Sequence, residues 1–325
     1  MCTAITLHTA EHYFGRNLDL EHSFGEGVVI VPRNMPLTFR MVPGMDRHLA
    51  IVGVGILQEG YPLWFDGINE AGIGMAGLNF PDNACYFPPE PEKDNVAPFE
   101  LIPWILGQCT DLAQVRELLG RLNVTALEFS SHLPSTPLHW MVASPEGSLV
   151  VESVKEGLRV YENPVGVLTN NPPFFYHMTR LTDFMSLTPQ IPCNRFSGRL
   201  DLAPYSRGMG AIGLPGDPSS SSRFIKAAFL RENSRCGSGE GESVGQFFHI
   251  LSGVEQQRGS VVLEGGKYEY TVYSSCCNLE RGIYYYSTYQ DRTVTGIDLF
   301  REDLEGRRSV WYPLVRETGL RIRNS

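Results

Sequence analysis

The sequence predicts an α+β fold in which helices cover β-sheets. Both ends of the chain consist mainly of segments rich in β-branched and aromatic residues, and in many of these apolar and polar residues alternate. Apolar residues spaced as in a helix are found mainly in the middle of the chain. The order is strands, helices, strands, helices, strands, which differs from the regular strand and helix alternation of a parallel sheet. We therefore expect sheets sandwiched between helices, in an α+β or four-layer arrangement.

The predicted strands are short, because 33 glycines and 22 prolines divide the chain. Near the C-terminal end, for example, Tyr268, Tyr270 and Val272 alternate with the residues between them, as in a strand with one buried face. On such patterns we predict strands at 2–8, 12–18, 27–32, 49–56, 63–67, 73–79, 138–143, 148–154, 158–162, 268–276, 281–289 and 293–298.

The clearest predicted helix covers 111–122, where leucine and valine recur three or four positions apart. Asp111 followed by Gln114 resembles a capping box at its start. The helices that we predict, in order, are 98–108, 111–122, 174–186, 220–233 and 243–252.

Three irregular stretches separate these elements, at 81–98, 189–218 and 234–243. The first two carry aromatic and apolar residues, so we expect ordered loops that cover a site or contact other subunits. The third is expected to be a flexible helix connection. We predict one domain over 1–325, because the strands at the two ends need each other as sheet partners.

Composition and charge narrow the possible partners. The chain has 27 Lys and Arg against 36 Asp and Glu, a formal charge of −9, which disfavours nucleic acid and anionic membranes as partners. No apolar stretch approaches the roughly 18 residues that span a bilayer. The first residues have no basic lead and no sustained apolar region, so we expect no secretory signal and a cytoplasmic location.

No metal or cofactor motif is found in the sequence. The chain has seven cysteines, an odd number, and no two of them have C-x-x-C spacing. We therefore expect no disulfide framework, no metal site and no cofactor. Residues 72–77 match G-x-G-x-x-G, but Pro81 argues against the helix that a nucleotide-binding fold needs there. We instead expect a glycine-rich strand that another backbone or a ligand approaches closely.

Cys2 is the strongest candidate for chemistry. Loss of Met1 would leave a thiol and a free α-amine on one residue, with ordinary pKa values near 8.5 and 7.7–8.0, so that nucleophile and base coincide. A hairpin of strands 2–8 and 12–18 places Cys2 opposite Leu18, with Arg16 on the diagonal at roughly 7–8 Å between backbones and Asp19 at the strand end. Arg16 would favour the thiolate and Asp19 could orient the amine. A surface ion pair on a hairpin and an incidental cysteine are the alternatives.

Many short segments match one known family in the same order over nearly the whole chain. They are MCTA (1–4), FGRNLD (14–19), VPRN (31–34), DGINEAG (66–72), GLNFP (77–81), LHWM (138–141), GVLTNNP (166–172), GLPGD (213–217), SRF (222–224) and GIYYY (282–286). In these segments the chain resembles the choloylglycine hydrolase family, and within it the bile salt hydrolases.

The resemblance implies an N-terminal nucleophile hydrolase of αββα architecture, whose nucleophile is exposed by the loss of Met1. It also implies an enzyme that is typically a homotetramer in the bacterial cytoplasm. Such enzymes hydrolyse the amide of glycine- or taurine-conjugated bile acids. It implies Cys2 as nucleophile, Arg16 and Asp19 as its partners, Asn79 and Asn170 at the reacting carbonyl, and Arg223 in support. Asn171 adjoins Asn170, so the second assignment could shift by one residue.

The residue types agree with these roles. Asparagine amides can donate to an oxyanion, although both are also common turn residues beside prolines. A cation such as Arg223 near the start of a helix is mildly unfavourable, which suggests a function. The family also includes penicillin V acylases, and the resemblance implies that these have a tyrosine at the position of Asn79. Asn79 therefore favours bile salts over penicillin V as the substrate.

A steroid is a large apolar body, so its pocket needs aliphatic and aromatic lining. We expect Leu18, Phe24, Trp64 and Phe65 in this lining, and the loops around Gln58 and 125–136 to set specificity. Two other functions stay open: a noncatalytic binder of steroids or acyl amides, and a hydrolase that uses Cys109 with His139.

Overall fold

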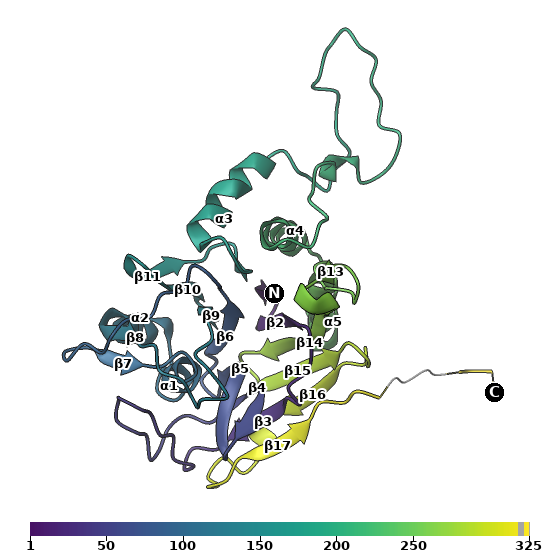
Figure 1. Ribbon diagram of the computed structural model, residues 1–325. Coiled ribbons are helices and arrows are strands. Elements are labelled where there is room, and N and C mark those ends of the chain that lie inside the picture. The colour runs from purple at the N-terminus through teal and green to yellow at the C-terminus, as the bar shows by residue number, and fades with distance from the viewer. Residues whose placement is uncertain (318–321, 325) are drawn as a thin grey trace.

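Two antiparallel β-sheets stacked face to face form the centre of the structure, a computed structural model that describes residues 1–317 and 322–324. Helices lie on the outer face of each sheet, as Figure 1 shows. The molecule therefore has the four layers, helix, sheet, sheet and helix, that the sequence predicts.

The first sheet joins strands from both ends of the chain. Gly15 allows its closest contact, since a Cβ there would lie 2.1 Å from the carbonyl oxygen of Ser275 on the neighbouring strand. The strand order is β12 (Val167–Leu168), β1 (Cys2–His8), β2 (His12–Leu20), β14 (Tyr268–Asn278), β15 (Ile283–Thr288) and β16 (Thr295–Asp298), and β13 (Val261–Val262) pairs with β14.

The second sheet contributes to two hydrophobic cores. Val28 and Ile30 of one strand face the first sheet, whereas Val29 and Val31 face the outer helices, as the period of two requires. The strand order is β11 (Gly157–Glu162), β10 (Gly147–Val154), β9 (Leu138–Ser144), β6 (Gly74–Asn79), β5 (Tyr61–Asn69), β4 (Ile51–Gln58), β3 (Gly27–Val31) and β17 (Val310–Pro313).

Each outer layer is formed by helices whose apolar residues pack on a sheet. α4 (Ser220–Glu232) and α5 (Glu240–Ser252) pack on the first sheet, and α1 (Leu101–Leu106) and α2 (Leu112–Arg121) pack on the second (Figure 1). The predicted cap of α2 is half formed: Asp111 accepts from the backbone N–H of Gln114, but the Gln114 side chain accepts from the N–H of Thr110. α3 (Phe174–Arg180) lies beside α4.

Each predicted strand and helix is present, with shifted ends. α3 ends at Arg180 and continues as a 3₁₀ turn, Leu181–Phe184. The predicted connection 234–243 is wrong over its last part, because α5 already begins at Glu240, where the acidic Glu240 and Glu242 stabilise the helix start. In the part of the chain that the structure describes, the strands that the periodicity missed are too short to show a period: β7 (Asp94–Val96), β8 (Leu122–Val124), β12, β13 and β17.

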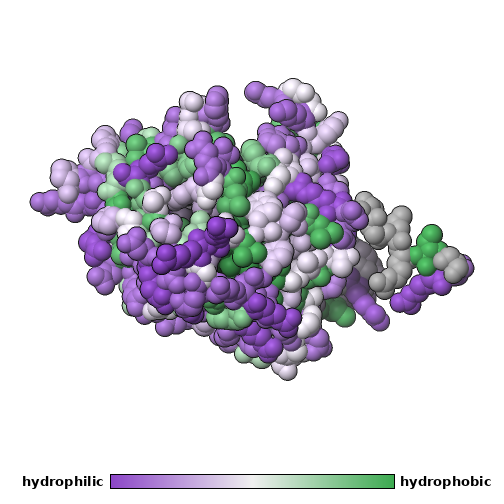
Figure 2. All heavy atoms as spheres, turned by 90° about the horizontal axis from the view of Figure 1, so that it is seen from below, coloured by the Kyte–Doolittle hydropathy of each residue, from purple (hydrophilic) through white to green (hydrophobic). Residues whose placement is uncertain are grey.

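The segment 189–218 projects from the body as a long arm beyond α3 and α4 (Figure 1). Its Phe196 and Tyr205 are 84% and 83% exposed, so two large aromatic side chains of the arm face solvent. Figure 2 shows one face of the molecule, which is mostly hydrophilic, with hydrophobic side chains gathered near its middle. Within the described residues, no helix is long and apolar enough to cross a membrane.

Candidate active site

Cys2 begins β1 and lines a cavity of ≈ 430 Å³. In the ladder of β1 and β2, Cys2 lies opposite Leu18 and Ala4 opposite Arg16, so the predicted hairpin register is confirmed. Because side chains alternate along a strand, Cys2, Leu18 and Arg16 share one face and all line the cavity. Met1 precedes Cys2 in this structure, so the terminal amine is that of Met1.

Arg16 places a buried positive charge at the cavity. Its Nη1 donates to the carbonyl oxygens of Phe65 (3.0 Å) and Gly77 (2.5 Å), both on the second sheet. Burial by itself lowers the pKa of Arg16, but the neighbouring Cys2 and Asp66, with other acidic groups, raise it above its usual value. The guanidinium therefore stays charged beside the thiol.

Arg223 and Asn170 hold the backbone of Cys2. The N–H of Cys2 donates to Asn170 Oδ1 at 2.7 Å, and Arg223 Nη2 donates to the same oxygen at 2.7 Å. Arg223 Nη1 also donates to the carbonyl of Cys2 and to Oγ1 of Thr3. Helix α4 thus directs a cation inward to the first residues of β1, which explains an arginine near the positive helix end.

Asp19 lies on the helix side of β2, next to these groups. Its Oδ1 accepts from Thr271 Oγ1 at 2.6 Å, and its Oδ2 is 4.0 Å from Arg223 Nη1. The backbone carbonyl of Asp19, rather than the carboxylate, accepts from the Met1 amine at 2.9 Å, and this amine also contacts Glu269. Burial lowers the pKa of the Met1 amine, although Cys2 and Asp19 oppose the change.

Asn79 and Asn170 come together, but in different orientations. Asn170 Nδ2 donates to the backbone carbonyl of Asn79 at 2.7 Å, so its amide group is already engaged at both ends. The Asn79 side chain lines the cavity with Cys2, and within the described residues it forms no hydrogen bond. Asn171 instead donates to the carbonyl of Pro81, which identifies Asn170 as the residue beside Cys2.

The cavity is lined mainly by apolar and aromatic side chains. Leu18, Phe24, Trp64 and Phe65, which the sequence analysis selected, all lie in its wall. Residues 129–136 supply part of the wall, whereas Gln58 at the end of β4 does not contribute. The lining residues that sequence reasoning missed are Leu20, Ile56, Leu63, Pro98, Phe99, Ile102 and Leu138.

A buried carboxylate behind Arg16 was also missed. Asp66 on β5 accepts from the hydroxyls of Tyr273, Ser275 (2.9 Å) and Tyr284 (2.7 Å). Burial raises the pKa of Asp66, although the charge of Arg16 and these hydrogen bonds oppose the rise. The partners lie more than 200 residues away in the sequence, so no local pattern could identify the cluster.

The structure does not support an active site built from Cys109 and His139. Cys109 is buried in the core between the second sheet and helices α1 and α2, and burial raises its pKa to about 12. His139 is hydrogen-bonded to Glu152 and to the carbonyl of Thr169 rather than to Cys109. A thiol that stays protonated and has no basic partner is a poor nucleophile.

The glycine-rich segment 72–77 lies in and before β6. A Cβ at Gly72 would lie 2.8 Å from the carbonyl oxygen of Leu279, which is the backbone approach that the sequence predicts, whereas at Gly74 the close neighbour is the ring of Phe14, 2.5 Å away. Gly77 lines the cavity, and its carbonyl accepts from Arg16. The segment is therefore a closely approached strand, as expected, and not a phosphate loop.

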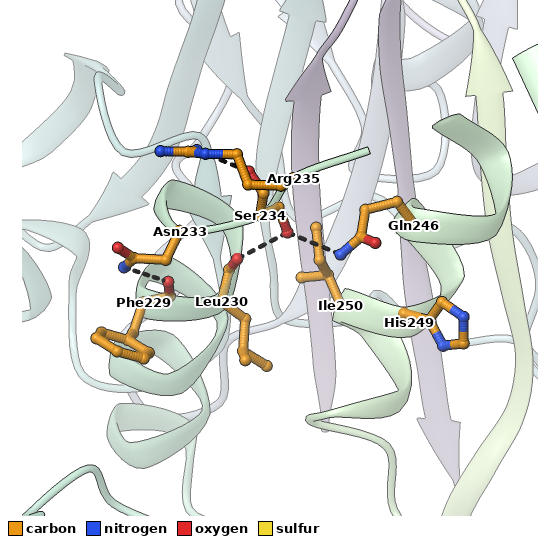
Figure 3. Close-up of a pocket in the computed structure, with 8 residues that line it drawn as sticks. All are labelled: Phe229, Leu230, Asn233, Ser234, Arg235, Gln246, His249 and Ile250. Atoms are coloured by element: carbon orange, nitrogen blue, oxygen red, sulfur yellow. Dashed lines mark hydrogen bonds between the residues drawn. The ribbon is translucent and has the colours of Figure 1, made fainter. Parts of the chain in front are cut away.

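A second hollow, of ≈ 260 Å³, lies between the end of α4 and α5. Figure 3 shows that its polar side chains bond one another and helix carbonyls: Gln246 donates to Ser234, and Ser234 to the carbonyl of Leu230. These contacts cap α4 rather than form a reactive site. Among residues 1–317 and 322–324, no group of three or more His, Cys, Asp and Glu side chains is placed to hold a metal ion.

Known proteins resemble this chain over almost its whole length. Residues 2–312 match the family described as linear amide C–N hydrolases, choloylglycine hydrolase family. A "Bile salt hydrolase/transferase" from Lactiplantibacillus plantarum is 50% identical, covering 98% of each chain. A protein of the same description from Clostridium perfringens is 37% identical, covering 96% of each chain.

Solved structures share the fold. A crystal structure of a variant of the conjugated bile acid hydrolase from Clostridium perfringens has a TM-score of 0.92 at 35% identity and covers 99% of this chain and all of that one. A penicillin V acylase from Agrobacterium tumefaciens, with a TM-score of 0.73 and 17% identity over 96% and 91% of the two chains, shares the fold alone. The predicted αββα fold of N-terminal nucleophile hydrolases is confirmed, and the chain belongs to the choloylglycine hydrolase family of linear amide C–N hydrolases.

Proposed function

We propose that this chain hydrolyses the amide bond of glycine- and taurine-conjugated bile acids, with Cys2 as nucleophile after loss of Met1. The observation that carries the proposal is the position of Cys2 in the wall of a mainly apolar cavity that also holds Arg16 and Asn79. A steroid body requires such a lining, with few polar groups at the reacting end. The bile salt hydrolases at 50% and 37% identity support the same substrate class.

Loss of Met1 gives the thiol its base. The amine then belongs to Cys2, whose nitrogen is held by Asn170 Oδ1. Cys2 is itself buried, and burial favours the neutral form of an amine at this residue. The amine takes the thiol proton, and the charge of Arg16 stabilises the thiolate.

The reaction then has two halves. Sulfur attacks the amide carbon, and the side-chain amide of Asn79 donates to the oxyanion. The C–N bond breaks, the leaving glycine or taurine nitrogen takes the proton from the Cys2 ammonium, and a thioester remains. Water, deprotonated by the same amine, attacks the thioester, the C–S bond breaks, and the sulfur recovers a proton as the bile acid leaves.

The remaining predicted residues support this chemistry. Arg223 joins the carbonyl of Cys2 to Asn170, and Asp19 balances the charge of Arg223. Leu18, Phe24, Trp64 and Phe65 are proposed to contact the steroid. The substrate head group is negative and the chain has a charge of −9, so local arginines rather than the overall field must attract it.

N-terminal sequencing and intact mass, combined with assays on glycocholate, taurocholate and phenoxymethylpenicillin, test the proposal. We expect active enzyme to begin at Cys2 and to prefer the bile salts. Cys2→Ala should bind them without releasing product, whereas Cys109→Ala, the matched control, should remain active. Full activity with Met1 retained, or hydrolysis by Cys2→Ala, would refute the mechanism. Binding without turnover by the wild-type protein would indicate a noncatalytic binder.

We also propose that four copies assemble through the arm 189–218, in the bacterial cytoplasm. The highly exposed Phe196 and Tyr205 on the arm support contacts between copies. Light scattering should give a tetramer for the wild-type protein and smaller species for a Phe196→Ser, Tyr205→Ser variant; a monomeric wild type would exclude the assembly. The seven cysteines form no disulfide, which supports a reducing compartment and is testable by cell fractionation.

A further inference from the structure

Three ionisable side chains are completely buried behind Asn79 and Asn170. They are His139 on β9, Glu152 on β10 and His177 on α3. Neither the proposed reaction nor the cavity wall uses them. A buried polar cluster is costly unless its hydrogen bonds serve a purpose, so its contacts identify what it supports.

The cluster holds the loop that carries Asn170. His139 Nε2 is 2.9 Å from the carbonyl oxygen of Thr169, and His177 Nε2 is 3.0 Å from that of Asn170. Both oxygens only accept, so each histidine nitrogen must carry a proton. Two consecutive carbonyls are thereby fixed at the residue whose side chain holds the nitrogen of Cys2.

The same histidine supports the segment that carries Asn79. The ring of Phe80, the next residue, stacks on His139 with centroids 4.2 Å apart and an interplanar angle of 5°. The loop and this segment are also joined directly, because Asn170 Nδ2 donates to the carbonyl of Asn79. His139 therefore contacts both segments that meet at Cys2.

The hydrogen bonds of His139 and Glu152 require one proton more than a neutral imidazole and a carboxylate carry together. His139 Nδ1 is 3.1 Å from Glu152 Oε1, which also accepts from the N–H of Phe174 at 2.9 Å. Both ring nitrogens of His139 thus face acceptor oxygens, whereas a neutral imidazole has one N–H. The pair is either imidazolium with carboxylate or imidazole with carboxylic acid, and is neutral as a whole in both forms.

We propose that His139, Glu152 and His177 are positioning residues that keep Asn79 and Asn170 aligned with Cys2. The inference rests on the roles of the two asparagines in the proposed function. A displacement of about 1 Å at reacting groups costs about 100-fold in rate. Loss of the His139 donor should therefore lower kcat and leave the cavity wall, and with it KM, nearly unchanged.

Two substitutions separate a hydrogen-bonding role from simple packing. His139→Phe keeps an aromatic ring against Phe80 but removes the donor to Thr169. His139→Gln removes the ring, yet its amide nitrogen can occupy the place of Nε2 and donate to the same carbonyl. Packing alone predicts that phenylalanine is tolerated better, whereas the positioning role predicts that glutamine is.

The test is steady-state hydrolysis of glycocholate by these two variants, with melting curves and the rate of Cys2 alkylation by iodoacetamide. We expect His139→Phe to lower kcat about 100-fold with little change in KM or alkylation, and His139→Gln to recover at least part of this loss. His249→Phe, on the exposed side of α5, is the matched control and should behave as the wild-type protein.

The outcomes separate the two proposals. The positioning role is refuted, and the proposed function is not, if a folded His139→Phe variant has the wild-type kcat or a higher kcat than His139→Gln. Absence of turnover by the wild-type enzyme refutes the proposed function, and this inference with it. If His139→Phe does not fold, His177→Phe decides: it keeps a ring against Phe224 but removes the donor to the carbonyl of Asn170, so kcat must still fall while KM holds, and an unchanged kcat overturns the proposal.

Discussion

Mild acid should destabilise this protein through His177. Burial is the main cause that lowers the pKa of His177 from 6.5 to about 4. The unfolded chain therefore binds a proton near pH 6.5, whereas the folded protein binds it only near pH 4. Because the unfolded state holds more protons in this window, the stabilising contribution of neutral His177 is complete above pH 6.5 and is lost as the pH falls through 4.

The size of the effect follows from the pKa difference. A shift of one pKa unit corresponds to 1.36 kcal/mol, so the fall from 6.5 to about 4 amounts to about 3 kcal/mol in the free energy of unfolding. At pH 4.5 most of this has been lost. Against a typical total of about 5–15 kcal/mol, the loss is large enough to measure.

Denaturant unfolding at pH 7 and pH 4.5, at one protein concentration, measures the contribution. His177→Gln keeps a side-chain donor for the carbonyl of Asn170 but does not titrate. We expect the wild-type protein to lose about 2–3 kcal/mol more than this variant between the two pH values. His249→Gln, an exposed control, should follow the wild type. Equal losses in wild type and His177→Gln would show that His177 does not couple folding to pH.

Three further substitutions test other parts of the structure. Arg223→Lys removes the forked donor that joins Cys2 to Asn170, so kcat for glycocholate should fall about 100-fold at similar KM; an unchanged kcat would contradict that role. Gly15→Ala places a methyl group 2.1 Å from Ser275 O and should cost at least about 3 kcal/mol in urea unfolding, and a wild-type midpoint would contradict the close approach. Leu18→Ala removes part of the cavity wall and should raise KM about 10-fold with little change in kcat, whereas a wild-type KM would place the steroid elsewhere.

Local patterns predicted the part of the site that lies on one hairpin. The turn between β1 and β2 fixes their register, so the relation of Cys2 to Leu18 and Arg16 follows from the sequence. Trp64 and Phe65 were assigned to the cavity for another reason, because they precede the segment 66–72, in which the chain resembles the family. Period and turn chemistry were sufficient for the contacts within the hairpin.

Contacts between distant segments could not be predicted in this way. The pairing of β14 with β2 brings Thr271 to Asp19, but a period of two does not specify which strands pair. Similarly, motif matching indicated Asn170 at the reacting carbonyl, whereas its Oδ1 accepts from the nitrogen of Cys2. Orientation of an amide depends on all its neighbours, and the hydrogen-bond partners of this one come from three separate elements, β1, β6 and α4.

The charges around Cys2 explain why so polar a site can be buried. Arg223 lies beside Asp19 on the helix side of β2, and Arg16 lies near Asp66 on the other side, so each cation has a carboxylate partner. In the proposed mechanism the proton moves from sulfur to nitrogen within Cys2, which creates two opposite charges and leaves the net charge of the site unchanged. A transfer between separate residues would instead move charge between segments in a medium of low dielectric, at greater cost. Nucleophile and base therefore belong to one residue, which lies between two arginines whose charges are compensated by carboxylates. The thiolate can then form without a proton acceptor from solvent.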